Sequence, residues 1–184
     1  MLKLVRDRLT TYVPKTIKDA DWACAGVLIP IFEKEGGLFI LLTKRTEEVN
    51  VHKGEVSFPG GMCETTDNDT MTTALRECEE EVGVNRKDVE IIGRIDDMRT
   101  ITGFLITPYV GLIPYPYPFK ISPKEVSYLI FLPFDELLKA DPSFEQAEHM
   151  NRTHSVPAIY YNGDKIWGAT CRMLLRLRDI ITNR

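Results

Sequence analysis

Residues 23–32 and 38–45 are two apolar segments rich in branched side chains, and the turn sequence Glu-Lys-Glu-Gly-Gly separates them. Branched apolar residues on both sides of a glycine-containing turn are typical of a strand, a turn and a second strand. A sheet built from such strands is stable only when another layer covers its apolar faces. The pair therefore predicts a sheet that is covered by other elements.

The pattern changes from strand to helix at residues 70–82, where apolar side chains recur at steps of three and four. Gly83 follows at the place where a helix takes its left-handed cap. A short helix is predicted at 133–138, and an amphipathic helix at 168–181 ends the sequence. Further strands are predicted at 56–58, 89–95, 104–113, 126–132, 156–161 and 165–167.

This order of elements predicts an α/β fold in which a central mixed sheet lies between helices. No repeat, low-complexity tract or flexible linker divides the chain, so we expect one domain over residues 1–184, with an N-terminal helical extension at 1–20.

Composition excludes some classes of function. The 23 Lys and Arg residues against 27 Asp and Glu give a net charge of −4, which disfavours nucleic acid or an anionic membrane as a partner. The four cysteines form no CxxC pair, so we expect neither a zinc site nor a disulfide framework. This cysteine pattern fits a reducing compartment. No apolar run reaches the length that spans a bilayer, and no secretory signal is evident, so the cytoplasm is the expected location.

Four glutamates, Glu77, Glu79, Glu80 and Glu81, crowd the last turns of the predicted helix at 70–82. The C-terminus of a helix carries partial negative charge, so each carboxylate there costs roughly 0.3–1 kcal/mol. Positions 77, 80 and 81 converge on one side of the helix. Convergent carboxylates suit a hard cation such as Mg²⁺ or Mn²⁺. The alternative is a solvated acidic face.

Residues 61–84, GMCETTDNDTMTTALRECEEEVGV, resemble the Nudix box, G-x5-E-x7-R-E-U-x-E-E-x-G-U, in which U is aliphatic. The second half of the box, from Arg76 onward, matches at the right spacing, with Cys78 at an aliphatic position. One residue is inserted before Arg76. Asp67 therefore stands at the place of the first box glutamate, which holds the box arginine in this family, and Glu64 is the alternative.

The resemblance implies an α/β/α sandwich and a metal-dependent attack of water on a diphosphate. The metal ligands would be Glu77, Glu80 and Glu81 with the carbonyl of Gly60, and Mg²⁺ or Mn²⁺ would be the cofactor. The same glutamates and Arg76 would form the catalytic group. Glu125 is a candidate remote base or further ligand, and the alternative is an exposed acid at a strand edge.

Residues 41–61, LLTKRTEEVNVHKGEVSFPGG, look like the motif that precedes the box in coenzyme A diphosphatases, L-L-T-x-R-S/A-x3-R-x3-G-x3-F-P-G-G. Residues 102–108 and 166–170 also look like that subgroup. The resemblance implies cleavage of CoA or acyl-CoA to 3′,5′-ADP and (acyl-)4′-phosphopantetheine. The substrate-binding candidates are Arg45, Lys44, Lys53 and Phe58.

Asn50 departs from the motif, because an arginine stands at this position in the subgroup; Lys44, His52 and Lys53 are nearby cations that could replace it. Two alternatives therefore stay open. The first is a Nudix hydrolase of another nucleoside diphosphate derivative, and the second is a non-catalytic Nudix domain that senses a nucleotide. A homodimer is a further expectation. The aromatic residues of 113–119 either line an acyl or pantetheine groove or pack at the surface.

Overall fold

The protein is described here from a computed structural model, which covers residues 1–19, 21–47, 53–149 and 152–183. The helices are α1 (Leu2–Thr11), α2 (Thr70–Val82), α3 (Phe134–Lys139) and α4 (Gly168–Thr182), with a 3-10 turn at Arg86–Asp88. The strands are β1 (Ala23–Lys34), β2 (Gly37–Arg45), β3 (Val56–Ser57), β4 (Gly60–Met62), β5 (Glu90–Arg94), β6 (Met98–Arg99), β7 (Phe104–Leu112), β8 (Val126–Pro133), β9 (Ser143–His149), β10 (Arg152–Tyr161) and β11 (Asp164–Trp167).

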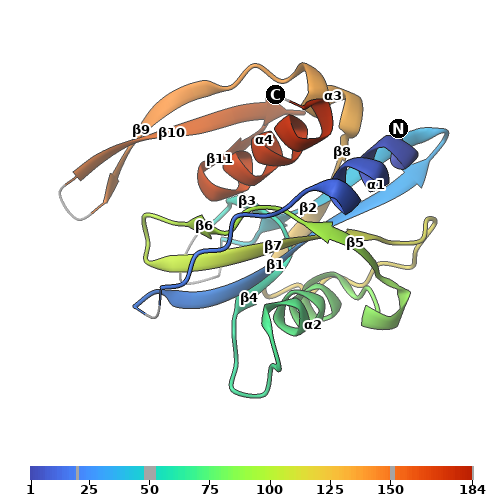
Figure 1. The fold of residues 1–184 in the computed structure, drawn as a ribbon, viewed down its shortest axis with the longest axis horizontal. Coiled ribbons are helices and arrows are strands. Elements are labelled where there is room, and N and C mark those ends of the chain that lie inside the picture. The colour runs from blue at the N-terminus through green and yellow to red at the C-terminus, as the bar shows by residue number, and fades with distance from the viewer. Residues whose placement is uncertain (20, 48–52, 150–151, 184) are drawn as a thin grey trace.

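A mixed sheet forms the centre of the molecule, with the order β3-β2-β1-β7-β5. Strands β1 and β7 are parallel, whereas β1 and β2 form the antiparallel pair that the turn at residues 33–37 predicts. Three further strands join this path, because β4 pairs with β1, β6 with β7 and β8 with β2. Helix α2 covers one face of the sheet, and α1 and α4 cover the other (Figure 1).

Alternation along β1 supplies both apolar layers, because successive side chains of a strand point to opposite faces. Ile29 and Ile31 are fully buried in the larger cluster, which includes residues of α1, α3 and α4. Leu28 and Phe32 are fully buried in the second cluster, with Ala74, Cys78 and Val82 of α2. The expected sandwich of a mixed sheet between helices is therefore confirmed.

A second, antiparallel sheet of β9, β10 and β11 extends from the sandwich beside α4 (Figure 1). Its β10–β11 hairpin turns at Asn162 and Gly163, which both have positive φ, as a tight hairpin turn requires. Sequence periodicity predicts this hairpin but misses β9, whose sequence SFEQAEH is largely polar. Strands β4 and β6 were also missed, because two or three residues are too few to show a period.

The expectation of no disulfide is wrong for one pair, because Cys24 and Cys63 are joined by a disulfide although they lie 39 residues apart. Antiparallel pairing of β1 with β4 places Ala25 opposite Met62, so the neighbouring residues Cys24 and Cys63 also lie opposite one another. Their Cα atoms are 5.5 Å apart. Cys78 and Cys171 are free and buried. No helix in the described part of the chain is long and apolar enough to cross a membrane.

Candidate active site

Local hydrogen bonds fix both ends of helix α2, and a glycine of β1 lets the helix pack closely on the sheet. The Asp69 side chain caps its first turn by accepting a 2.7 Å hydrogen bond from the Thr72 amide. Gly83 adopts φ of 74° and donates its amide to the Glu79 carbonyl at 3.0 Å, as the sequence predicts. A side chain at Gly26 of β1 would collide with the backbone of Thr70, so this glycine permits the close approach of α2. The C-terminal turns of α2, and their glutamates, are therefore fixed beside β4.

Arg76 lies at the centre of the acidic group. It makes a two-pronged contact with Asp67, because its Nε and Nη2 donate to the two carboxylate oxygens at 3.1 and 3.0 Å. Its Nη1 donates to Glu77 at 2.8 Å and to Glu80 at 3.2 Å. One guanidinium therefore orients two of the predicted metal ligands.

Asp67, and not Glu64, is the main partner of Arg76. Its carboxylate also accepts from the Thr73 hydroxyl at 2.9 Å and from the Glu64 amide at 3.0 Å. The hydrogen bonds from Arg76 come first among the contacts that hold the pKa of Asp67 well below its usual range. The Glu64 carboxylate lies 3.8 Å from the guanidinium and is exposed. The inserted residue thus leaves the acid–arginine pair intact.

Glu81 is a buried carboxylate with few partners. Its side chain is only 3% exposed, and its Oε2 has no hydrogen-bond partner among the described residues. Among the described residues, the Arg45 guanidinium faces this carboxylate, with Nη1 at 3.8 Å from Oε1. Burial raises the pKa of Glu81 to about 8; Arg45 opposes the rise, while the charges of Glu77 and Glu125 add to it. The structure therefore brings Glu125 into the electrostatic neighbourhood of the box glutamates.

The other glutamates of α2 differ in their surroundings. Burial raises the pKa of Glu77, whose carboxylate lies so close to Gly61 that a side chain at Gly61 would collide with it. Glu80 is exposed at 58% of its side chain. Glu79 points to the other side of the helix and binds Arg86 at 2.7 Å. Arg76 thus joins Glu77 and Glu80, the charge of Glu77 acts on Glu81, and Glu79 faces away from them.

The donor chemistry of these carboxylates suits a hard divalent cation. Within the described residues, no three acidic, His or Cys side chains are already placed as a ligand set. Arg76 forms hydrogen bonds to two of the carboxylates, those of Glu77 and Glu80. Carboxylate oxygens are nevertheless the ligands that Mg²⁺ and Mn²⁺ prefer. The unpartnered Oε2 of Glu81 is buried where a neighbouring cation would offset the cost of its charge. Glu77, Glu80 and Glu81 are the residues that could hold the ion.

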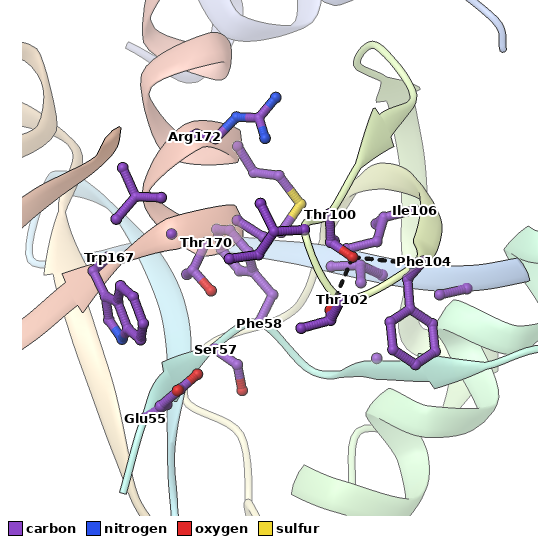
Figure 2. Close-up of a pocket in the computed structure, with 18 of the residues that line it drawn as sticks. Glu55, Ser57, Phe58, Thr100, Thr102, Phe104, Ile106, Trp167, Thr170 and Arg172 are labelled. Atoms are coloured by element: carbon purple, nitrogen blue, oxygen red, sulfur yellow. Dashed lines mark hydrogen bonds between the residues drawn. The ribbon is translucent and has the colours of Figure 1, made fainter. Parts of the chain in front are cut away.

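A cavity of about 520 Å³ opens beside Gly60 and Gly61, between the sheet and the start of α4. We call it the α4 cavity. Its floor includes Val27 of β1, Phe58 just after β3 and Ile106 of β7. One wall is the segment from Thr100 to Phe104, and the other is the segment from Trp167 to Met173 (Figure 2).

The predicted substrate-binding residues are only partly brought together. Arg45 and Phe58 line the α4 cavity. Lys44 does not, because alternation along β2 turns it away from Arg45, and its Nζ binds Asp164 at 2.9 Å. Lys53 is exposed and also lies outside the cavity lining. Asn50 and His52 fall outside the described residues.

No site role is predicted from the sequence for Ile101, Trp167, Arg172 or Met173, although all four line the α4 cavity. A signal was nevertheless present. Residues 102–108 and 166–170 resemble the coenzyme A diphosphatases, and both segments contribute to the cavity. No local pattern shows that two segments so far apart in sequence face one another.

The aromatic residues of 113–119 do not line the α4 cavity. Tyr115 stacks on Phe32 at 4.9 Å between ring centroids, on the α2 face of the sheet. The Tyr117 hydroxyl donates to Asp88 and accepts from the Asn85 amide. The packing alternative is therefore correct for these two tyrosines.

Comparison with known proteins agrees with this geometry. The NUDIX domain pattern matches residues 23–165. The chain is 33% identical over 165 residues to a protein of Photorhabdus laumondii named uncharacterized Nudix hydrolase NudL, with 89% of this chain and 87% of the relative covered. A NudL protein of Escherichia coli O6:H1 is 36% identical over 166 residues, with 83% and 80% covered.

Solved structures agree on the fold. A MutT/nudix family protein from Enterococcus faecalis has a TM-score of 0.55 at 11% identity, with 100% of this chain and 70% of that chain covered. The NUDIX domain of Shewanella oneidensis NrtR, solved with ADP ribose, has a TM-score of 0.51 at 23% identity, with 72% and 85% covered. With the family match and the two relatives above, these findings lead to one conclusion: the chain belongs to the Nudix family and is a hydrolase that acts on pyrophosphate bonds.

Proposed function

We propose that this Nudix hydrolase cleaves the diphosphate of coenzyme A or acyl-CoA to 3′,5′-ADP and (acyl-)4′-phosphopantetheine. One observation supports the proposal above all. Three segments whose sequences resemble the coenzyme A diphosphatases, at 41–61, 102–108 and 166–170, all contribute residues to the α4 cavity. The cavity opens at Gly60 and Gly61, next to the box glutamates.

Each residue of the site has a separate task in this proposal. Glu77, Glu80 and Glu81, with the Gly60 carbonyl, hold Mg²⁺ or Mn²⁺, and Glu125 adds negative charge beside them. When bound, the ion supplies charge neutralisation of the diphosphate and a lower pKa for the attacking water. Arg76 orients Glu77 and Glu80, and Asp67 fixes Arg76. Arg45 faces the diphosphate from the cavity rim, and Phe58 supports the apolar floor.

The direct test is incubation of the purified protein with CoA and Mg²⁺, with 3′,5′-ADP followed by chromatography. We expect release by the wild type, and a loss of at least about hundredfold in Glu80→Gln, because removal of one ligand carboxylate costs several kcal/mol of transition-state stabilisation. Glu79→Gln is the matched control, since Glu79 lies on the same helix but binds Arg86 on its other side. It should keep near wild-type activity.

A substrate panel separates the proposal from its alternative. Dephospho-CoA, ADP-ribose and nucleoside triphosphates are compared with CoA by kcat/KM. Preference for CoA or acyl-CoA supports the proposal. Cleavage of another diphosphate without release of 3′,5′-ADP from CoA would instead assign the enzyme to a different nucleoside diphosphate derivative.

Three wider expectations remain predictions. We propose one domain over residues 1–184, since α1 contributes Val5 and Leu9 to the core that it shares with α4. We also propose a cytoplasmic location and a homodimer. Light scattering of the purified protein gives its mass in solution and tests the homodimer.

A further inference from the structure

The α4 cavity has an apolar interior built from distant parts of the chain. Ile101 and Phe104 form one side, Trp167 and Met173 form the other, and Met173 is only 3% exposed. Figure 2 shows the labelled side chains of Phe104 and Trp167 on opposite sides of the cavity. One end of the cavity reaches Gly60 and Gly61, so a group bound in it would be continuous with a diphosphate at the box glutamates.

The charged residues of the lining balance one another, because Arg45 and Arg172 are matched by Glu55 and Glu148. Arg172 donates to the Arg99 carbonyl at 3.2 Å. Arg45 lies 3.8 Å from Glu81, at the end of the cavity where the proposed function places the diphosphate, and its Nε has no hydrogen-bond partner among the described residues. A phosphorylated nucleoside needs charge-assisted hydrogen bonds from cations that are available to it. This lining suits an uncharged, mainly apolar group better than a phosphate.

We infer that the α4 cavity binds the pantetheine arm of the substrate together with its thioester-linked acyl chain, and that the nucleotide arm lies outside it. The inference rests on the proposed function and adds a preference to it: the enzyme acts on acyl-CoA better than on free CoA.

The polar groups and the size of the cavity fit such an arm. The threonines at 100, 102 and 170 place hydroxyls among the apolar side chains, and amides in an apolar pocket need such partners. The Thr100 hydroxyl already contacts that of Thr102 at 3.0 Å and accepts from the Phe104 amide, which orders this side of the cavity (Figure 2). The volume of about 520 Å³ lies within the roughly 300–1,000 Å³ of small-molecule sites.

The first experiment measures kcat/KM for CoA and for acetyl-, hexanoyl- and octanoyl-CoA. Each methylene moved from water into an apolar site is worth up to about fourfold in affinity, so kcat/KM should rise along the series. Ala169→Phe fills the cavity and should reduce the dependence of kcat/KM on acyl-chain length. Ala140→Phe, a half-buried alanine at the end of α3 outside the cavity, is the matched control and should leave the dependence unchanged.

A second experiment assigns the arm without relying on turnover. S-octyl-4′-phosphopantetheine and 3′,5′-ADP, one probe for each half of the substrate, are titrated into a Trp22→Phe protein, in which Trp167 is the single tryptophan. We expect the pantetheine probe to change Trp167 fluorescence. Ala169→Phe, and separately Ile101→Ser at the opposite wall, should weaken its binding at least tenfold while 3′,5′-ADP binding stays the same.

The outcomes separate the two proposals. If both variants weaken the binding of 3′,5′-ADP instead, or the binding of neither probe, the inference is overturned even when CoA is a substrate. If no CoA ester is cleaved but the pantetheine probe binds and responds to both variants, the proposed function fails and the assignment of the cavity stands. Melting curves of every variant show whether a loss of binding reflects the cavity or the fold.

Discussion

At the scale of single residues, ionisation of Glu81 carries a cost that the fold offsets only in part, since its pKa is raised to about 8 although Arg45 opposes the rise. Its carboxylate is buried, one oxygen has no partner among the described residues, and Arg45 remains 3.8 Å away. Buried charges without close partners destabilise a protein, and residues that serve a reaction often do so. We therefore expect Glu81→Gln to lose at least about hundredfold in kcat while its melting temperature holds or rises.

Thermal unfolding with and without Mg²⁺ checks this expectation. Mg²⁺ should raise the melting temperature of the wild type, because a ligand that binds only the folded state stabilises it, and should raise that of Glu81→Gln less. A variant that melts several degrees lower and keeps its activity would show that Glu81 is structural.

Asp67 acts on the proposed metal ligands through Arg76, which it holds in place. Asp67→Asn should loosen Arg76 and lower kcat about tenfold, because Glu77 and Glu80 lose their common anchor. The folded-state pKa of Asp67 lies below its ordinary value of 3.8, so its contribution to stability is present above pH 3.8 and is lost as the pH falls toward the folded-state pKa. Urea unfolding at several pH values should show a difference in the free energy of unfolding between wild type and variant at pH 7, and this difference should disappear in acid. A difference in the free energy of unfolding that persists in acid would contradict a stabilising role for the ionised Asp67 carboxylate.

At the scale of elements, the chain that follows α1 is tied to α4 by one tyrosine. The Tyr12 hydroxyl donates to Asp96 at 2.5 Å and accepts from Arg176 at 2.7 Å, and Arg176 also donates to Asp96 at 2.9 Å. Hydrogen bonds to charged groups contribute about 1.5–3 kcal/mol. Tyr12→Phe should therefore lower the free energy of unfolding by about 1.5 kcal/mol and leave kcat unchanged.

The matched control is Tyr160→Phe, measured by the same urea titration. Tyr160 also donates to a carboxylate, that of Glu145, but the residue is 63% exposed, so loss of its hydroxyl should change stability little. An equal loss of unfolding free energy in both variants would mean that burial does not strengthen the hydrogen bonds of Tyr12.

At the scale of the whole molecule, the Cys24–Cys63 disulfide closes a loop of about 40 residues that contains β1, β2, β3 and β4. In the chain-entropy description, a cross-link over this separation stabilises the folded state by about 4 kcal/mol. We expect the double variant Cys24→Ser/Cys63→Ser to unfold at correspondingly lower urea. Reductant should produce the same loss in the wild type and no further loss in the variant. An unchanged midpoint in both would show that the bridge adds nothing to stability in solution.

Much of the fold follows from local chemistry that the sequence displays. The helix at 70–82 ends at Gly83 because only a left-handed cap suits that position, and strand and helix periods place most elements near their observed bounds. The strands that were missed are two or three residues long or largely polar. They form because longer neighbours, β1, β7 and β10, offer them hydrogen bonds.

By itself, the sequence determined the α/β order of elements and the helical spacing that predicts Glu77, Glu80 and Glu81 on one side of α2. The family resemblance indicated Asp67 as the partner of Arg76, with Glu64 as the alternative, and the hydrogen bonds of Arg76 decide for Asp67. Only the tertiary structure decided that Lys44 turns to Asp164, that Cys24 meets Cys63, and that residues 100–104 face the start of α4 across a cavity. Strand register and the packing of α4 on the sheet set these contacts, and no local pattern encodes the distance between segments that meet only after the sheet has formed.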